Sequence, residues 1–534
     1  MGALFTAILG GLAALGVPLF VLVGAATALC FLLFTDDHRS IDSLLPMVQA
    51  MEQLLTRQEF LAIPLFMASG AIMTAGGIAA RLVEVAKAGL GWLPGGLAVA
   101  AVAACMFFAA ISGSSPVTLI AVGSILLPAM VKSNYPEDFG LGLLTTAGSL
   151  GCLVPPSISM LIYAISITSS SARVDPQDLF LAGLLPAALI GGMLASYAIW
   201  KGRSIPGGRE PFDGAKFTAA VRGGVWALLL PVLVLGGIYG GLYTPSEAGG
   251  VAAAYALFVT GVVYRELTLK KALAVLVESA TLMGSLLLII VLAFGLNEFL
   301  ADIQIQDHIM ALLKRLDLGP AGFLLLVNVL LVVIGALMDS ISCTLIFAPM
   351  LAPVAWELYG IDPLHFGVVF VINMEIGYLM PPVATNLFVA AAVFKKPFGY
   401  VTRAVLPTLA MTCGALVVFM YVPTLSVALV RAQHGQPMTL AFPWDGKGAA
   451  DADAAQDAAD VATLVALDAA DPLPASPTAT GAATGAVPAA AQAAPALDLG
   501  AITAGAFADD EGEEDLAGAA TAADLGAAPT GVAP

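Results

Sequence analysis

The sequence predicts an all-α protein that crosses a membrane many times and is built from two copies of one unit. Its 534 residues are 59% hydrophobic and only 11% charged, a composition that excludes a soluble globular domain. Several apolar stretches reach the roughly 20 residues that a helix needs to span a bilayer. Two polar interruptions of apolar sequence also recur at an offset of 226 residues, which indicates an internal repeat.

Matching residues around the two interruptions define the repeat. Thr118 corresponds to Thr344, and Pro155 corresponds to Pro381. In each copy, a break containing Ser and Thr therefore lies 37 residues ahead of a Pro-Pro break. Irregular backbone persists at membrane depth only where it is packed in protein or lines a cavity. We therefore expect both kinds of break to surround a binding site.

The first 59 residues are expected to form an N-terminal membrane helix or helix pair, followed by an interfacial helix (residues 1–59). Gly16-Val17-Pro18 either divides or kinks the apolar stretch that ends near Phe34. Between Ser40 and Leu55, apolar residues recur at helical spacing among polar ones. This pattern is typical of a helix that lies in the membrane interface.

The two repeats are expected at residues 60–200 and 279–430, on either side of a cytoplasmic linker and scaffold helices at residues 201–278. In each repeat, a re-entrant hairpin contains the first break and a broken transmembrane helix contains the Pro-Pro pair. The expected bounds are residues 94–131 for the first hairpin, 139–171 for the first broken helix, 319–353 for the second hairpin and 365–394 for the second broken helix.

The distribution of Lys and Arg predicts that the two copies are inverted. A threading with five cytoplasmic loops places 14 of the 20 bases that precede the tail on the cytoplasmic side, in agreement with the positive-inside rule. Basic residues then flank the first hairpin, whereas the loop after the second contains Glu357 and Asp362 and no base. The hairpins therefore enter from opposite sides. Inverted hairpins with broken helices are typical of secondary transporters, whose binding site lies near the midplane.

Residues 445–534 are expected to form a disordered, acidic, Ala-rich tail. This segment holds 15 acidic residues and one Lys, and so carries most of the chain's net charge of −17. Its few large apolar residues could not offset the entropy cost of ordering it. A docking tail is the functional alternative. No nucleic-acid partner is expected.

The first copy contains a cluster of candidate residues for binding a cation or substrate. Gly and Pro stop the helices and leave amides and carbonyls unpaired, while hydroxyls add neutral oxygens. Each Pro also frees a carbonyl one turn earlier, and such oxygens suit Na⁺. Helix packing by small residues and a simple proline kink are the structural alternatives. The candidates are Ser112, Gly113, Ser114, Ser115, Thr118, Gly148, Gly151, Pro155 and Ser157.

The second copy differs by having an acid in its first break. Asp339 lies in a long apolar run, and an intramembrane carboxylate is a functional hypothesis by default. It either neutralises a bound cation or caps the helix that begins at Ser340. Glu375 faces the cavity or pairs with a base. The candidates in this copy are Gly335, Asp339, Ser340, Ser342, Gly377, Pro381, Thr385 and Asn386.

Other motifs have structural explanations or point away from enzymes. Thr244-Pro245-Ser246-Glu247 has the pattern of a helix capping box and is not placed in the site. The histidines and cysteines lack the spacing of a metal site, and the sequence contains no phosphate-binding loop. No nucleophile, base and acid come together either. We therefore expect no enzyme and no cofactor, with transport driven by a gradient or a partner.

Several stretches match one family closely: 108–116, 147–157, 179–186, 243–248, 338–340 with 348–349, and 381–382 with 386–388. With these residues, the chain resembles the large membrane subunit of tripartite ATP-independent periplasmic (TRAP) transporters, over residues 1 to about 430. The resemblance implies import of an organic acid by an elevator motion in a bacterial inner membrane, with Na⁺ as the coupling ion. It also implies two partners, a small four-helix membrane subunit and a periplasmic substrate-binding protein.

The resemblance further implies two Na⁺ sites, one at residues 112–115 with 148–155 and one at residues 335–340 with 377–381. Two residues depart from the family pattern, since Met380 stands where Thr is frequent and Ala384 where Gly is common. Two alternatives remain open. One is a stand-alone Na⁺-coupled anion carrier of similar fold, and the other is an ion channel with similar hairpins.

Overall fold

The computed structural model describes residues 11, 17, 19–34, 41–167, 172–205, 209, 211–382 and 384–444, and every regular element within them is helical. Nine of these helices are long and apolar enough to cross a membrane. The chain divides into a unit at Met1–Leu464 and a second unit at Val465–Pro534. The expected acidic tail, the end of the first broken helix at residues 168–171 and most of the first 18 residues lie outside the described residues.

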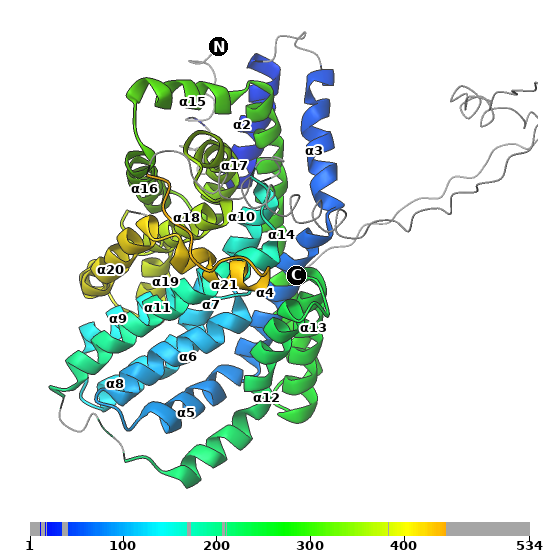
Figure 1. Cartoon of the computed structure of the whole chain (residues 1–534). Coiled ribbons are helices and arrows are strands. Elements are labelled where there is room, and N and C mark those ends of the chain that lie inside the picture. The colour runs from blue at the N-terminus through cyan, green and yellow to red at the C-terminus, as the bar shows by residue number, and fades with distance from the viewer. Residues whose placement is uncertain are drawn as a thin grey trace, which may run out of the picture. The chain divides into compact units, whose positions relative to one another are not determined.

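The N-terminal helices pack on one long helix from the middle of the chain. Helices α2 (Leu19–Phe34) and α3 (Leu45–Leu55) both lie against α14 (Leu269–Asp302), as Figure 1 shows. Helix α4 (Ala62–Ala75) contacts α14 and packs most extensively on α13 (Pro245–Phe258). Helix α14 has 34 residues. The expected boundary between the scaffold helices and the second repeat, at residues 278 and 279, therefore lies inside one continuous helix.

The first repeat contains an antiparallel hairpin and an interrupted helix. The first arm of the hairpin is α6, the chain turns at Gly113, and the second arm contains a π-helical turn. In the interrupted helix, the Pro-Pro break follows a short 3-10 turn. The elements are α5 (Ile78–Leu90), α6 (Gly96–Ser112), α7 (Ser115–Thr118), the π turn η3 (Leu119–Gly123), α8 (Ser124–Lys132), α9 (Glu137–Ser149), η4 (Leu150–Cys152), α10 (Ile158–Ser166) and α11 (Pro176–Gly202).

Between the repeats, α12 (Gly214–Tyr239) packs on α5, and α13 begins with the predicted capping box. The Thr244 hydroxyl accepts a hydrogen bond from the backbone N–H of Glu247, and the Glu247 carboxylate accepts one from the backbone N–H of Thr244. This reciprocal arrangement satisfies two N-terminal donors of α13. The structural interpretation of this motif is therefore confirmed.

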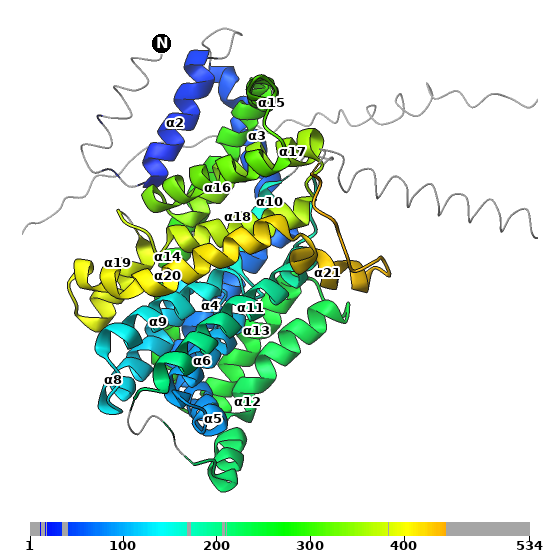
Figure 2. The ribbon, with the colours of Figure 1, turned by 60° about the vertical axis from the view of Figure 1, so that its left-hand side comes forward.

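The second repeat again has a hairpin and an interrupted helix. Its hairpin turns at Met338 and Asp339, and its second arm continues to Tyr359. Helix α18 packs on both arms of this hairpin, and α20 lies against α9 and α18 in both views (Figures 1 and 2). The elements are α15 (Ile305–Leu316), α16 (Pro320–Leu337), α17 (Ser340–Tyr359), α18 (Pro363–Gly377), α19 (Thr385–Phe394), α20 (Phe398–Tyr421) and α21 (Thr424–Gln433).

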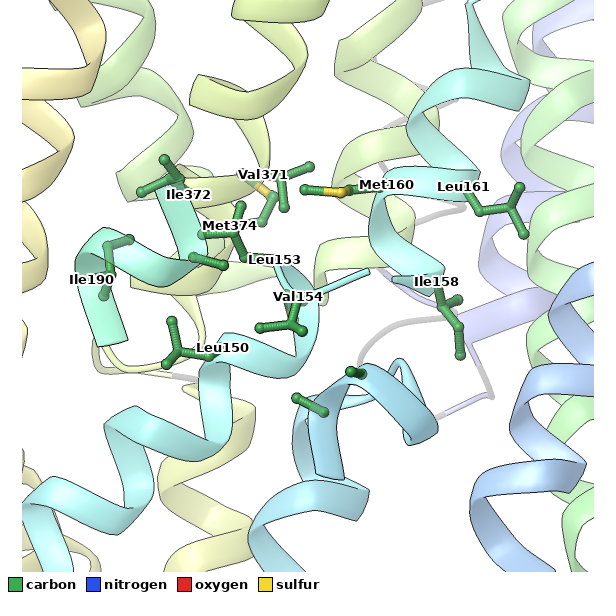
Figure 3. Packing of buried hydrophobic residues seen from close by; sticks show 14 of the residues in the cluster. Leu150, Leu153, Val154, Ile158, Met160, Leu161, Ile190, Val371, Ile372 and Met374 are labelled. Atoms are coloured by element: carbon green, nitrogen blue, oxygen red, sulfur yellow. The ribbon is translucent and has the colours of Figure 1, made fainter. Parts of the chain in front are cut away.

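The hydrophobic core continues from one broken helix to the other. Figure 3 shows side chains on either side of the first Pro-Pro break packed beside side chains of α18. Those on the α9 to α10 segment come from Leu150, Leu153, Val154, Ile158 and Met160, and those on α18 come from Val371, Ile372 and Met374; all are buried. This core fixes the irregular backbone of the first copy against the second copy.

Ala384 provides a test of the backbone after the second Pro-Pro pair. It adopts φ of 39°, in the left-handed region, which costs a non-glycine residue roughly 1–2 kcal/mol. Ala384→Gly should therefore raise the Tm slightly, because this relief exceeds the about 0.8 kcal/mol lost with one buried methyl group. The exposed helical Ala392→Gly is the control and should lower stability by about 1 kcal/mol. Equal destabilisation by both changes in a thermal unfolding assay would contradict this explanation.

Candidate functional site

The turn of the first hairpin is held against the first broken helix by direct backbone contact. Gly113 has φ of 59°, and a Cβ added to it would lie 2.5 Å from the carbonyl oxygen of Pro156. The backbone N–H of Ile158 donates to the Gly113 carbonyl at 3.2 Å. A Cβ on Gly151 would lie 2.8 Å from the carbonyl carbon of Ser114. These glycines are required because the two segments approach too closely for any side chain.

Oxygen atoms gather at this turn. The Ser112 and Thr118 hydroxyls lie 2.9 Å apart, and the Thr118 hydroxyl donates to the Ser114 carbonyl at 2.9 Å. The Ser112 hydroxyl also lies 3.3 Å from the same carbonyl. Ser112, Ser115 and Thr118 are all buried. The first break therefore presents neutral hydroxyl and carbonyl oxygens that face one another, which is the donor chemistry that suits a hard monovalent cation.

The proline-freed carbonyls are mostly satisfied by new donors. Pro156 removes the helical donor to Cys152, and the Ser157 hydroxyl donates to that carbonyl instead. In the second copy, the Gly377 carbonyl accepts from the Met380 N–H at 3.2 Å, and the Tyr378 carbonyl accepts from the Asn386 N–H at 3.2 Å. Ser157 also caps α10, so its role in this structure is local.

The second hairpin turns without a glycine, and Asp339 caps the helix that follows. Its carboxylate accepts from the Ser342 N–H at 3.0 Å and from the Ser342 hydroxyl at 2.7 Å. The capping alternative is thus observed, and each carboxylate oxygen retains a lone pair for a further partner. Gly335 lies against Gly377, where an added Cβ would be 2.8 Å from the Gly335 carbonyl carbon. Ser340 is buried beside this turn.

Two hydrogen bonds join the first copy to the second. The Asn386 side-chain amide donates to the Ser115 hydroxyl, which places α19 on the turn of the first hairpin. The Ser149 hydroxyl donates to Glu375 Oε1 at 2.9 Å, and both residues are fully buried. These two residues are separated by 226 positions, the repeat offset. Glu375 therefore contacts its own counterpart in the other copy, rather than a base.

The predicted residues are not all equally placed. Those of the first copy meet at one turn, and Gly335, Asp339, Ser340, Ser342 and Gly377 meet at the other. Thr385 is only half-buried, and Pro381 is exposed whereas Pro155 is buried. The sequence interpretation missed Ser149, although its match with Glu375 at the repeat offset was a usable signal. It also missed Asn328 and Asn373, whose buried side-chain amides hydrogen-bond to each other.

Gly151→Ala tests the close approach of the two first-copy segments. The added methyl group would press on the Ser114 backbone, which cannot rotate away, so we expect a loss of about 1–3 kcal/mol in stability. Gly192→Ala in α11 is the matched control, since an added Cβ there meets nothing within 4 Å. Thermal unfolding in detergent measures both changes. If Gly151→Ala behaved like Gly192→Ala, the two segments would not be in contact.

Comparison with known proteins gives a consistent family. The model of the DctM component of tripartite ATP-independent periplasmic transporters matches residues 6–425. The C4-dicarboxylate TRAP transporter large permease protein DctM of Pseudomonas aeruginosa is 43% identical over 411 residues, which cover 76% of this chain and 93% of the relative. The isethionate TRAP transporter permease protein DctMQ of Oleidesulfovibrio alaskensis is 37% identical over 367 residues, which cover 68% of this chain and 57% of that relative.

A solved structure supports the fold alone. The Alcanivorax borkumensis YdaH transporter is similar with a TM-score of 0.53 and 15% identity, over 79% of this chain and 98% of that chain. The family match covers both hairpins and both broken helices. The chain therefore belongs to the DctM components, the large permease subunits of TRAP transporters, and is a multi-pass protein of the bacterial inner membrane.

Proposed function

We propose that this permease imports a small organic acid and that a Na⁺ gradient drives the import. The observation that carries the proposal is the bond from Asn386 to Ser115, because it brings the turn of the first hairpin and the interrupted helix of the second copy to one place. Buried hydroxyl and carbonyl oxygens of residues 112–118 are assembled there. Relatives named for C4-dicarboxylates and isethionate support a small organic anion as the substrate class.

The proposal includes two inverted copies and an elevator motion. Residues related by an internal two-fold axis contact their own counterparts only near that axis, and Ser149 contacts Glu375 in this way. The charge distribution of the loops supports opposite orientations for the two hairpins. In this arrangement, each hairpin and its neighbouring broken helix form one half-site, and the two half-sites move together.

The two half-sites would hold Na⁺ by different means. In the first, the neutral oxygens of Ser112, Thr118 and the Ser114 carbonyl fit a cation of low charge. In the second, Asp339 adds a full negative charge at the start of α17. Asn386 supplies a buried side-chain oxygen that has no hydrogen-bond partner among the described residues. That oxygen is free to accept from a substrate group or to ligate a cation.

We also propose the two partners that the family resemblance implies, a small four-helix membrane subunit and a periplasmic substrate-binding protein. Support comes from the DctMQ relative, of whose length this chain covers 57%. That protein has room for a further segment in the same chain.

Reconstitution distinguishes this function from the two alternatives. Proteoliposomes containing this chain, the small subunit and the binding protein should take up succinate or isethionate only with an inward Na⁺ gradient. Uptake by this chain alone would favour the stand-alone carrier and overturn the requirement for partners. Single-channel conductance that persists without substrate would favour the channel.

Asp339→Asn separates charge from capping. Asn is as good an N-cap as Asp, so α17 should stay intact while the negative charge is lost. We expect the Na⁺ concentration for half-maximal uptake to rise by roughly tenfold, which corresponds to about 1.4 kcal/mol. Asp213→Asn is the matched control, because Asp213 caps the exposed start of α12 in the same way. An unchanged Na⁺ dependence in Asp339→Asn would remove Asp339 from the mechanism.

A further inference from the structure

Helix α17 contains two prolines that each remove a backbone donor. Pro349 has no N–H to offer the carbonyl of Leu345, and Pro353 has none to offer the carbonyl of Pro349. An α-helix bonds each carbonyl to the N–H four residues later, so these two carbonyls lose their helical partners. In a membrane protein, such carbonyls need partners from other protein groups or from water in a cavity. The second arm of the hairpin therefore needs donors from outside its own backbone.

Two side-chain amides supply those donors. Asn297 of α14 donates from Nδ2 to the Leu345 carbonyl at 2.8 Å. Gln306 of α15 donates from Nε2 to the Pro349 carbonyl at 2.9 Å. Each amide thus meets one of the two carbonyls that the prolines release, and the pair ties α17 to two consecutive helices.

The amides border a cavity of about 320 Å³ between these helices. Asn297, Gln306, Pro349 and Pro353 all line it. Helix α17 also packs on α14 and α15 elsewhere, and the two bonds join the three helices at the edge of the cavity. At the repeat offset of 226, the positions of Asn297 and Gln306 correspond to Ala71 and Ala80, which have no amide. The pair of side-chain amides is therefore not repeated at the matching positions of the first copy.

We propose that Asn297 and Gln306 are positioning residues, which hold α17 and so fix the second half-site at its N-terminal end. Leu345 lies three residues, less than one helical turn, after Ser342, whose N–H and hydroxyl both bond to the Asp339 carboxylate. The Thr344 hydroxyl, next to Leu345, bonds back to the Ser340 carbonyl at 2.7 Å. A shift of Leu345 is therefore transmitted to the half-site over a single turn. This role rests on the proposed Na⁺ binding at residues 339–342.

A double-mutant cycle tests the bonds without reference to transport. Asn297→Ala should lower the Tm, because the Leu345 carbonyl is left without a donor. Pro349→Ala restores a backbone N–H to that carbonyl, so Asn297→Ala should lower the Tm much less in the Pro349→Ala background. Gln306→Ala with Pro353→Ala forms the second cycle. Equal losses in both backgrounds would show that these amides do not replace the missing donors, and would overturn the proposal.

Na⁺ titration tests the positioning role. Stabilisation of the purified protein by NaCl, measured against KCl, should require a several-fold higher Na⁺ concentration in Asn297→Ala. Adding Pro349→Ala to this variant should restore the Na⁺ response of the wild type. Gln53→Ala is the matched control, because Gln53 lines the same cavity and its side chain makes no hydrogen bond that the structure describes. Its Na⁺ response should remain that of the wild type.

The thermal cycle and the Na⁺ titration together distinguish a failure of the positioning role from a failure of the proposed Na⁺ coupling. A lowered Tm in Asn297→Ala with an unchanged Na⁺ response would overturn the positioning role and leave a purely structural bond. If the wild-type protein showed no Na⁺ response at all, the proposed Na⁺ coupling would fail. The thermal cycle would in that case still decide whether the amides occupy these carbonyls.

Discussion

The organisation of this permease depends on one constraint, that backbone polar groups inside a membrane must be satisfied by the protein. Each interruption of a helix releases such groups, and several of the released carbonyls accept a hydrogen bond from a donor outside the regular helical pattern. The Gly113 carbonyl takes the Ile158 N–H, and the Tyr378 carbonyl takes the Asn386 N–H. Irregular backbone is therefore retained where another donor completes it, either across the same break or from a second segment.

This requirement turns local breaks into long-range contacts. The partner of a released carbonyl comes either from across the same break, as for Cys152 and Tyr378, or from a neighbouring segment, as for Leu345. The Asn297 amide satisfies the Leu345 carbonyl from a neighbouring helix, and the bond from the Asn386 amide to the Ser115 hydroxyl adds a side-chain link between the two copies. The interruptions that create a polar site in the bilayer thereby also fasten together the helices that surround it.

Much of this arrangement could be predicted from local patterns. The helix interruptions, the capping box at Thr244 and the membrane-spanning stretches depend on Gly, Pro, Thr and apolar runs, whose effects act within a turn or two. The partners of the breaks could not be predicted in this way. Asn297 and Leu345 are 48 residues apart, and nothing around Asn297 shows which carbonyl its amide reaches. The sequence left two roles open for Asp339, and its capping of α17 is seen only from its extended backbone, with ψ of 152°, and its bonds to Ser342.

The two copies satisfy the same constraint by different chemistry, and this difference bears on how they could work. The first turn uses Gly113 in the left-handed region and closes on buried hydroxyls, so its oxygens are neutral and enclosed. The second turn has no glycine and uses a carboxylate cap, next to a Pro-Pro pair that is exposed. A charged, more accessible half-site attracts a cation from farther away than a neutral, enclosed one. On the proposed Na⁺ binding, we therefore expect the second half-site to bind the ion first, while the Ser149 to Glu375 bond joins the two copies.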